Sequence, residues 1–355
     1  MGLRPLLYLV GFEFGLLGLL FVLLFLWSRV RIVLGAGRAR RELAAHAALR
    51  GWSEGDPAGP VRRALERCPI ASLPRILGTR AARRAEEAGL SVAELVRSSA
   101  AHRRALRWAR SRLWWRRLTA AELLAAAGGP GDVPTLVRLL ADRHPAPATA
   151  ALLGARRLRS DRLIPPLLDL TVGWTHGPLS AKEHVRIVLA GFGEALVEPL
   201  AERLRSVEDE AGRVALLQLA GRLGREALRA EIERSLAHGG LEARISAARA
   251  LASLPRRGSV GPLRAALEDP AWQVRAQAAA ALGRLEARTA ADGLLRALAD
   301  PSWWVRLRAG LALRQLGWKG ERLLESVRPE TDRYAHDMAR YVLGLEDAAV
   351  WEYVS

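Results

Sequence analysis

The side chains that most often catalyse reactions or bind metals are few and scattered in this chain. Its seven histidines show no His-x-x-His or HExxH spacing, so none are paired on one helical face as metal ligands. Cys68 is the one cysteine, which excludes an intramolecular disulfide and a CxxC site; we expect a buried small hydrophobe there. The sequence also lacks phosphate-binding glycine loops and a GxSxG elbow. We therefore expect no catalysis, no cofactor and no metal.

Tryptophans near the C-terminal end are better candidates for function. Trp272 and Trp303 stand 31 residues apart at equivalent positions of a repeat, and Trp304 and Trp318 lie close by in the sequence. Equivalent positions of a repeat array line up along one edge, so these rings could form an aromatic strip that binds a protein partner. The alternative is that they cover the turns of their own repeats.

A second candidate is the segment 97–118, which contains eight arginines and no acid. Read as one helix, it has an apolar stripe on one face, tryptophans on the opposite side and arginines over much of the remainder, which suits a helix lying on anionic lipid headgroups. Nucleic acid is another possible ligand, because arginine binds phosphates and tryptophan stacks on bases; a solvated helix is the third possibility. The residues expected at this surface are Arg103, Arg104, Arg107, Trp108, Arg110, Trp114, Trp115, Arg116 and Arg117.

The elements that position these residues are predicted to be helices. Among 355 residues, 6% are aromatic, and alanine and leucine dominate. These two residues favour helix, whereas residues that favour strands are scarce, so we predict an all-α protein. The net charge of +17 is uneven: residues 29–121 carry 21 Arg against 7 acids, a net of +14. The excess of positive charge therefore lies in the N-terminal third.

The N-terminus contains an apolar stretch, residues 6–27, with Glu13 as its one ionisable group. As a helix it would measure about 33 Å, the thickness of a bilayer core. Arginines follow at once, which by the positive-inside rule places the rest of the chain in the cytoplasm. A cleaved signal fits less well, because no small-x-small site follows Trp27. We predict a single-pass anchor in the cell membrane at residues 1–28 and a basic helical juxtamembrane region at 29–118.

A repeat of 31 residues occupies the C-terminal two thirds. Residues 267–285 align with 298–316, which pairs Asp269 with Asp300 and Arg275 with Arg306. Each unit is predicted to form two helices, the first with the aspartate as its N-cap and Pro270 or Pro301 at its first position. A lone helix pair cannot bury its apolar face, so we predict stacked repeats over residues 119–345 and a tail at 346–355.

These units resemble the HEAT repeat family, and within it the short bacterial form often called phycocyanobilin-lyase-like, through the signature D-P-x-x-x-V-R. The resemblance is strongest over residues 207–317 and implies a right-handed α-solenoid that serves as a binding scaffold. It also implies that repeat arginines and aspartates pair between adjacent units, and so gives them a structural role. Lyase activity is not implied, because nothing here identifies a tetrapyrrole site. The matching residues are Asp269, Pro270, Val274, Arg275, Asp300, Pro301, Val305 and Arg306.

Together these features lead us to expect a membrane-anchored HEAT-type scaffold on the cytoplasmic face. Its expected partners are an unidentified protein, for instance part of a membrane enzyme complex, and anionic lipid headgroups. The alternative function is a nucleic-acid-binding HEAT protein that uses residues 97–118. We disfavour this alternative because the positive charge lies beside the anchor and not along the repeats.

Overall fold

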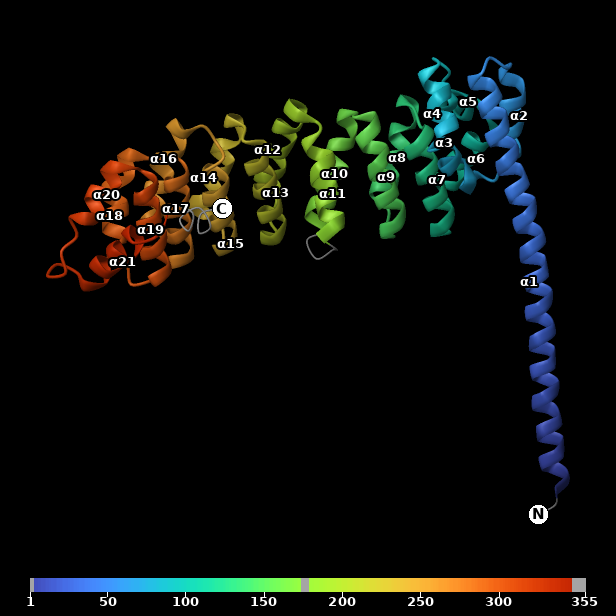
Figure 1. Ribbon diagram of the computed structural model, residues 1–355, viewed down its shortest axis with the longest axis horizontal. Coiled ribbons are helices and arrows are strands. Elements are labelled where there is room, and N and C mark those ends of the chain that lie inside the picture. The colour runs from blue at the N-terminus through green and yellow to red at the C-terminus, as the bar shows by residue number, and fades with distance from the viewer. Residues whose placement is uncertain (1–2, 174–178, 347–355) are drawn as a thin grey trace. The chain divides into compact units, whose positions relative to one another are not determined.

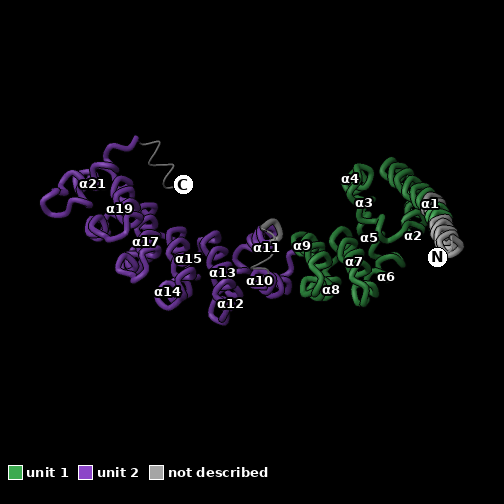
Figure 2. Tube along the Cα trace, turned by 90° about the horizontal axis from the view of Figure 1, so that it is seen from below, with its two compact units in different colours: residues 1–158 green, residues 159–355 purple. Residues whose placement is uncertain are grey.

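The computed structural model consists of helices joined by short turns, and the part of the chain that it describes contains no strand (Figure 1). It describes residues 3–173 and 179–346, without the side chains of residues 3–19, 26, 28–34, 179–181 and 256–257. The all-α prediction is confirmed. Most of the expected tail, 346–355, lies outside the described residues. The chain divides into two compact units, Met1–Leu158 and Arg159–Ser355 (Figure 2).

Unit 1 begins with a helix of 51 residues, α1. The last turns of α1 bury Ala45, Leu49 and Trp52 where the helix packs on α2 and α4. The remaining helices of the unit are short, and α7 packs along α9. Their bounds are α1 Leu3–Ser53, α2 Ala58–Arg67, α3 Leu73–Leu77, α4 Arg80–Glu87, α5 Val92–Ser98, α6 Ala100–Trp108, α7 Trp114–Ala127, α8 Val133–Leu140 and α9 Pro145–Leu158.

The predicted membrane anchor and membrane localisation are wrong. Within the described residues, no helix combines the length and the apolar character that crossing a bilayer requires. The prediction treated residues 6–27 as a segment of their own. In the structure they are part of α1, which continues without a break through the arginine-rich stretch to Ser53.

Unit 2 is a two-layer stack of helix pairs. The first helices of successive repeats, α13, α15, α17 and α19, pack side by side in that order, and α21 packs on α19. The second helices, α14, α16 and α18, each pack on the first helix that follows. The bounds are α10 Ile164–Gly173, α11 Leu179–Ala190, α12 Val197–Ser206, α13 Glu210–Leu223, α14 Arg229–His238, α15 Leu241–Leu251, α16 Arg256–Ala265, α17 Trp272–Arg284, α18 Ala291–Ala297, α19 Trp303–Gln315, α20 Trp318–Glu325 and α21 Arg333–Leu343.

Small residues set the close spacing of the first helices. Ala278 and Ala281 on α17 are fully buried. Gly283 lies within the last turn of the same helix, at its crossing with α19. A Cβ atom added there would lie 2.8 Å from the Cα atom of Ala312. At Gly221, 62 residues earlier, an added Cβ atom would lie 3.1 Å from the Cα atom of Ala250. Such contacts exclude larger side chains.

Candidate interaction surface

Bidentate ion pairs link adjacent repeats of unit 2. Arg275, on α17, donates from Nε and Nη2 to the two carboxylate oxygens of Asp300, at 2.7 and 2.9 Å. Its Nη1 donates to the carbonyl oxygens of Asp269 and Pro270, in the turn that precedes its own helix. Arg244 donates to Asp269 in the same way, at 2.9 and 3.1 Å. Each arginine therefore holds two successive turns together, as the family resemblance implied.

The repeat aspartates do not cap helices, contrary to our expectation. Helix α17 begins at Trp272 and α19 at Trp303, and the residues at their N-cap positions are Ala271 and Ser302. Asp269 instead accepts a hydrogen bond from the backbone N–H of Ala271. Asp300 accepts one from Ser302. The aspartate thus stabilises the turn by accepting from the backbone N–H two residues later, and the proline lies within this turn. The same carboxylate also accepts the two hydrogen bonds from the arginine of the preceding repeat.

These contacts change the protonation equilibria of both partners. Burial by itself raises the pKa of the Asp300 carboxyl, but the hydrogen bonds from Arg275 and from the Ser302 backbone outweigh it and hold the pKa below its ordinary value. The hydrogen bond to Asp300 raises the pKa of Arg275 above its ordinary value. Both side chains are therefore ionised at neutral pH, as a stabilising pair requires.

The same arrangement occurs in unit 1, where we had not predicted it. Arg117 donates from Nε and Nη2 to Asp142, and from Nη1 to the carbonyl oxygens of Ser111 and Arg112. Asp142 also accepts from the backbone N–H of His144. The lipid-facing role expected for Arg117 does not fit these contacts, because its guanidinium is held inside the unit.

A sequence signal for this repeat was present. Residues 113–117 read LWWRR, and residues 302–306 read SWWVR, with both tryptophans and the final arginine in register. The signal was overlooked because Ser111 and Arg112 stand where later repeats have Asp-Pro. The basic composition of the segment then favoured the lipid interpretation.

The segment 97–118 is not one interfacial helix. It contains the end of α5, all of α6 and the start of α7, with a turn between α6 and α7. Ser91 accepts from the backbone N–H of Glu94 and caps α5, which ends at Ser98. Thr119 lies inside α7 and donates to the carbonyl oxygen of Trp115. The break follows from Ser99, which accepts from His102 and starts α6 anew.

The exposed residues of this segment include Arg103, Arg104, Arg107 and Arg110 on α6 and the turn after it. They also include Arg112, Leu113, Trp114 and Trp115 just before and at the start of α7. Trp114 stacks on His144, with ring centroids 4.2 Å apart and nearly parallel planes. Arg116 lies over two other rings, those of Trp108 at 5.7 Å and Trp115 at 5.1 Å. Several of these groups therefore contact one another within unit 1 and do not form a uniform basic face.

The four tryptophans that we expected to bind a partner lie in unit 2 and are exposed. Their exposed fractions are 40% for Trp272, 45% for Trp303, 52% for Trp304 and 67% for Trp318. The first is on α17, the next two on α19 and the last on α20, and α19 packs on both other helices. We call these four residues the aromatic edge. Large apolar side chains exposed on adjacent elements of one unit are typical of interaction sites.

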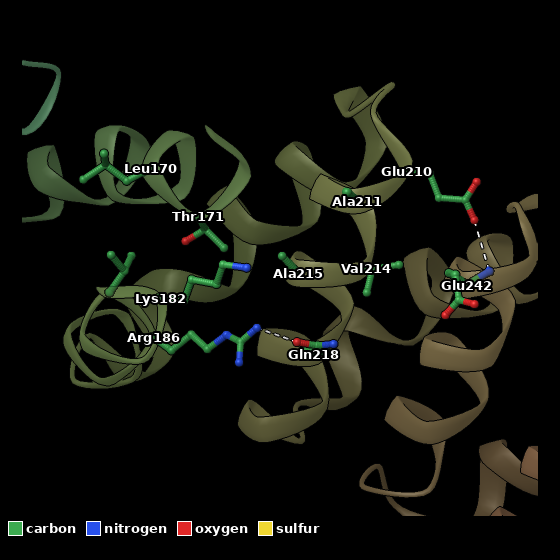
Figure 3. Close-up of a pocket in the computed structure, with 11 residues that line it drawn as sticks. Leu170, Thr171, Lys182, Arg186, Glu210, Ala211, Val214, Ala215, Gln218 and Glu242 are labelled. Atoms are coloured by element: carbon green, nitrogen blue, oxygen red, sulfur yellow. Dashed lines mark hydrogen bonds between the residues drawn. The ribbon is translucent and has the colours of Figure 1, made fainter. Parts of the chain in front are cut away.

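A groove of about 460 Å³ in unit 2 lies between α10, α11, α13 and α15 (Figure 3). Its polar side chains are mostly engaged in structural contacts. Arg186 donates to Gln218 across the groove. Glu210 accepts from the backbone N–H of Glu242, at 3.1 Å, and so caps the start of α15. These contacts hold neighbouring helices together and do not converge on a substrate position.

No cluster of metal-binding side chains occurs within the described parts of the chain. Cys68 is buried, as expected, and burial raises the pKa of its thiol, which disfavours the reactive thiolate. The chain is thus defined by stacked helix pairs, by arginine links between their turns and by exposed aromatic rings, which is the description of a helical repeat protein.

Comparison with known proteins is consistent with this class. Residues 260–343 match the model of the family described as HEAT repeats, so this stretch carries HEAT repeats. No curated protein matches the sequence.

The chain is also similar to solved structures at low sequence identity. One is an engineered protein, with 19% identity, a TM-score of 0.33 and coverage of 60% of this chain and 95% of that one. Another is human deoxyhypusine hydroxylase in complex with glycerol, with 18% identity, a TM-score of 0.31 and coverage of 79% and 98%. A third is Kap121p bound to Ste12p, with 11% identity, a TM-score of 0.38 and coverage of 85% and 45%.

Proposed function

We propose that this protein is a noncatalytic HEAT-repeat scaffold that binds a protein partner through the aromatic edge. The single observation that supports this function most is the exposure of Trp272 and Trp303 at equivalent positions of two adjacent helices, α17 and α19. Tryptophan is enriched among the residues that dominate binding energy at protein interfaces. The D-P-x-x-x-V-R spacing at 269–275 and 300–306 supports assignment to the short bacterial form of the repeat.

The aromatic edge is suited to binding because its rings are already ordered. Trp303 and Trp304 pack edge to face, with centroids 4.9 Å apart. Their helix is held on both sides, by α17 and by α20. A partner would therefore contact a preorganised surface, and little side-chain entropy would be lost on binding.

Site-specific cross-linking of the full-length chain in its native cells tests this function. A photoreactive amino acid replaces Trp304 in one variant and Trp115, the equivalent residue of unit 1, in a matched control. We expect a defined protein adduct from position 304 that resists nuclease, and its loss when Trp272→Ala and Trp303→Ala are added. Equal adducts at both positions, or a nuclease-sensitive adduct, would contradict the proposal.

A further inference from the structure

The inter-repeat links of unit 2 do not continue beyond α19. Arg306 uses Nη1 as the earlier arginines do, donating to the carbonyl oxygens of Asp300 and Pro301 at 2.8 and 3.1 Å. Its Nε atom is buried and has no hydrogen-bond partner among the described residues. In Arg244 and Arg275 this same atom donates to an aspartate of the next repeat. The donor that holds a carboxylate elsewhere in the array is thus unsatisfied here.

The missing acceptor has a local cause. The two closed links join an arginine to an aspartate 25 residues later, and Thr331 stands at that spacing from Arg306. The neighbouring Asp332 accepts from the backbone N–H of Ala335, at 2.9 Å, and caps α21. Asp332, one of the two acidic residues that flank the expected position, is therefore committed to starting a helix.

A pocket of about 360 Å³ lies beside Arg306, between α19 and α21. It is lined by Trp303, Arg306, Tyr334, Asp337, Met338 and Tyr341. The guanidinium carbon of Arg306 lies 5.3 Å from the centroid of the Tyr334 ring, within the range of a cation–π contact. Asp337 also contributes negative charge, and its carboxylate lies 3.8 Å from Arg333. The pocket thus combines a fixed guanidinium donor with apolar and aromatic walls.

Two other arginines with a buried, unpartnered Nε have their charge compensated in other ways. Arg203 forms an ion pair with Asp169, at 3.2 Å. Arg116 lies over the faces of two tryptophan rings. Arg306 also lies over an aromatic ring, that of Tyr334. It differs because its unpartnered donor is the atom that binds aspartate in Arg244 and Arg275, and because it lines a pocket.

We propose that the Nε edge of Arg306 binds the carboxylate of an aspartate in a turn of the partner protein, with an apolar side chain beside it in the Trp303 and Tyr334 pocket. This inference rests on the proposed scaffold function and specifies the partner's chemistry. The chain itself shows the complementary ligand, because the turn containing Asp300 fills the equivalent position on Arg275. A partner turn would thereby extend the array by one link.

The probe is a fluorescein-labelled, acetylated and amidated peptide with the sequence LADPSWW of residues 298–304, titrated into the full chain and followed by anisotropy. We expect saturable binding that weakens about tenfold or more when the peptide aspartate becomes asparagine, the loss of a charged hydrogen bond. Arg306→Gln is expected to weaken binding equally, while Arg333→Gln, a matched arginine beside the pocket, leaves it unchanged.

Several outcomes would overturn the inference. They are equal binding of the aspartate and asparagine peptides, no effect of Arg306→Gln in a variant that melts normally, and displacement by acetate at matched ionic strength as effective as by unlabelled peptide. Cross-linking of a partner at position 304 without any peptide binding would leave the scaffold function standing and reject the carboxylate site. Peptide binding without a cross-linked partner would support the carboxylate site and contradict the proposed scaffold function.

Discussion

Arg117 in unit 1 and Arg306 in unit 2 follow nearly the same local sequence and have different surroundings. Both come after a pair of tryptophans, and both donate from Nη1 to two backbone carbonyls five and six residues earlier. Arg117 also has Asp142 as a bidentate acceptor, whereas Arg306 has no acceptor for Nε among the described residues. Local sequence therefore sets the arginine's conformation, and the following turn decides whether its Nε atom has a carboxylate partner.

The largest expected effect comes from breaking a closed link. Asp300→Asn leaves the charge of Arg275 without its carboxylate in a partly buried site, and we expect a loss of about 3 kcal/mol in the free energy of unfolding of unit 2. Asp142→Asn is expected to have a similar effect on unit 1. Urea unfolding followed by circular dichroism checks both. A loss below that of Arg306→Gln would show that the closed links are not structural.

Acid provides a second test of the closed links. Although burial alone raises the pKa of Asp142, hydrogen bonds from Arg117 and the His144 backbone hold it below its ordinary value, and Asp300 behaves alike. A carboxyl with a depressed folded pKa contributes stability above its unfolded pKa of about 3.9, which is lost as the pH falls through the folded value. The stability gap between wild type and Asp300→Asn is therefore expected to be full at neutral pH and to narrow below about pH 4. Unfolding curves across this range measure it, and a constant gap would contradict the pairing.

The stacked rings of unit 1 predict a smaller effect. Trp114 stacks on His144, while the residue that follows Trp272 at the same spacing is Ser302. A double-mutant cycle between Trp114→Ala and His144→Ala is expected to show a coupling free energy of about 1 kcal/mol. The equivalent cycle between Trp272→Ala and Ser302→Ala serves as the control and is expected to show almost none. Equal couplings would remove this difference between the units.

The smallest expected effect on stability is that of Arg306→Gln. Removing this guanidinium leaves no acid unpaired, although it removes the hydrogen bonds from Nη1 to the turn, so we expect a loss of about 1 kcal/mol or less. A thermal melt of the variant measures it. A loss as large as that of Asp300→Asn would mean that Arg306 is a structural residue and would weaken the proposed carboxylate site.

The sequence predicted the fold where its signals were local and repeated. Alanine and leucine content indicated helices, and the Asp-Pro turns located the repeats around residues 269 and 300. The sequence-based interpretation was wrong where it relied on amino-acid composition and not on the spacing of residues. The arginines of residues 97–118 pointed to a lipid surface. Arg117, however, pairs with Asp142, which lies in the turn after α8. The position of a partner 25 residues away cannot be found from charge content.

The unpartnered donor of Arg306 was equally hidden from the sequence. Its D-P-x-x-x-V-R match is complete, so it is indistinguishable from Arg275 in the pattern. The difference arises downstream, where Asp332 caps α21. The exposure of the aromatic edge also required the packed structure, since the same spacing fits rings that cover turns.

The double grip of each closed arginine has a consequence for how the array comes apart. Because Arg275 holds its own turn and the next one, opening either turn would leave a charged group or a carboxylate without its partner in the other. Opening one repeat therefore also destabilises its neighbour by leaving a charged group unpaired, and unfolding becomes cooperative across the boundary between them. The stack from α15 to α19 would melt as one block, and its C-terminal edge, where the grip is single, would be the point from which unravelling begins.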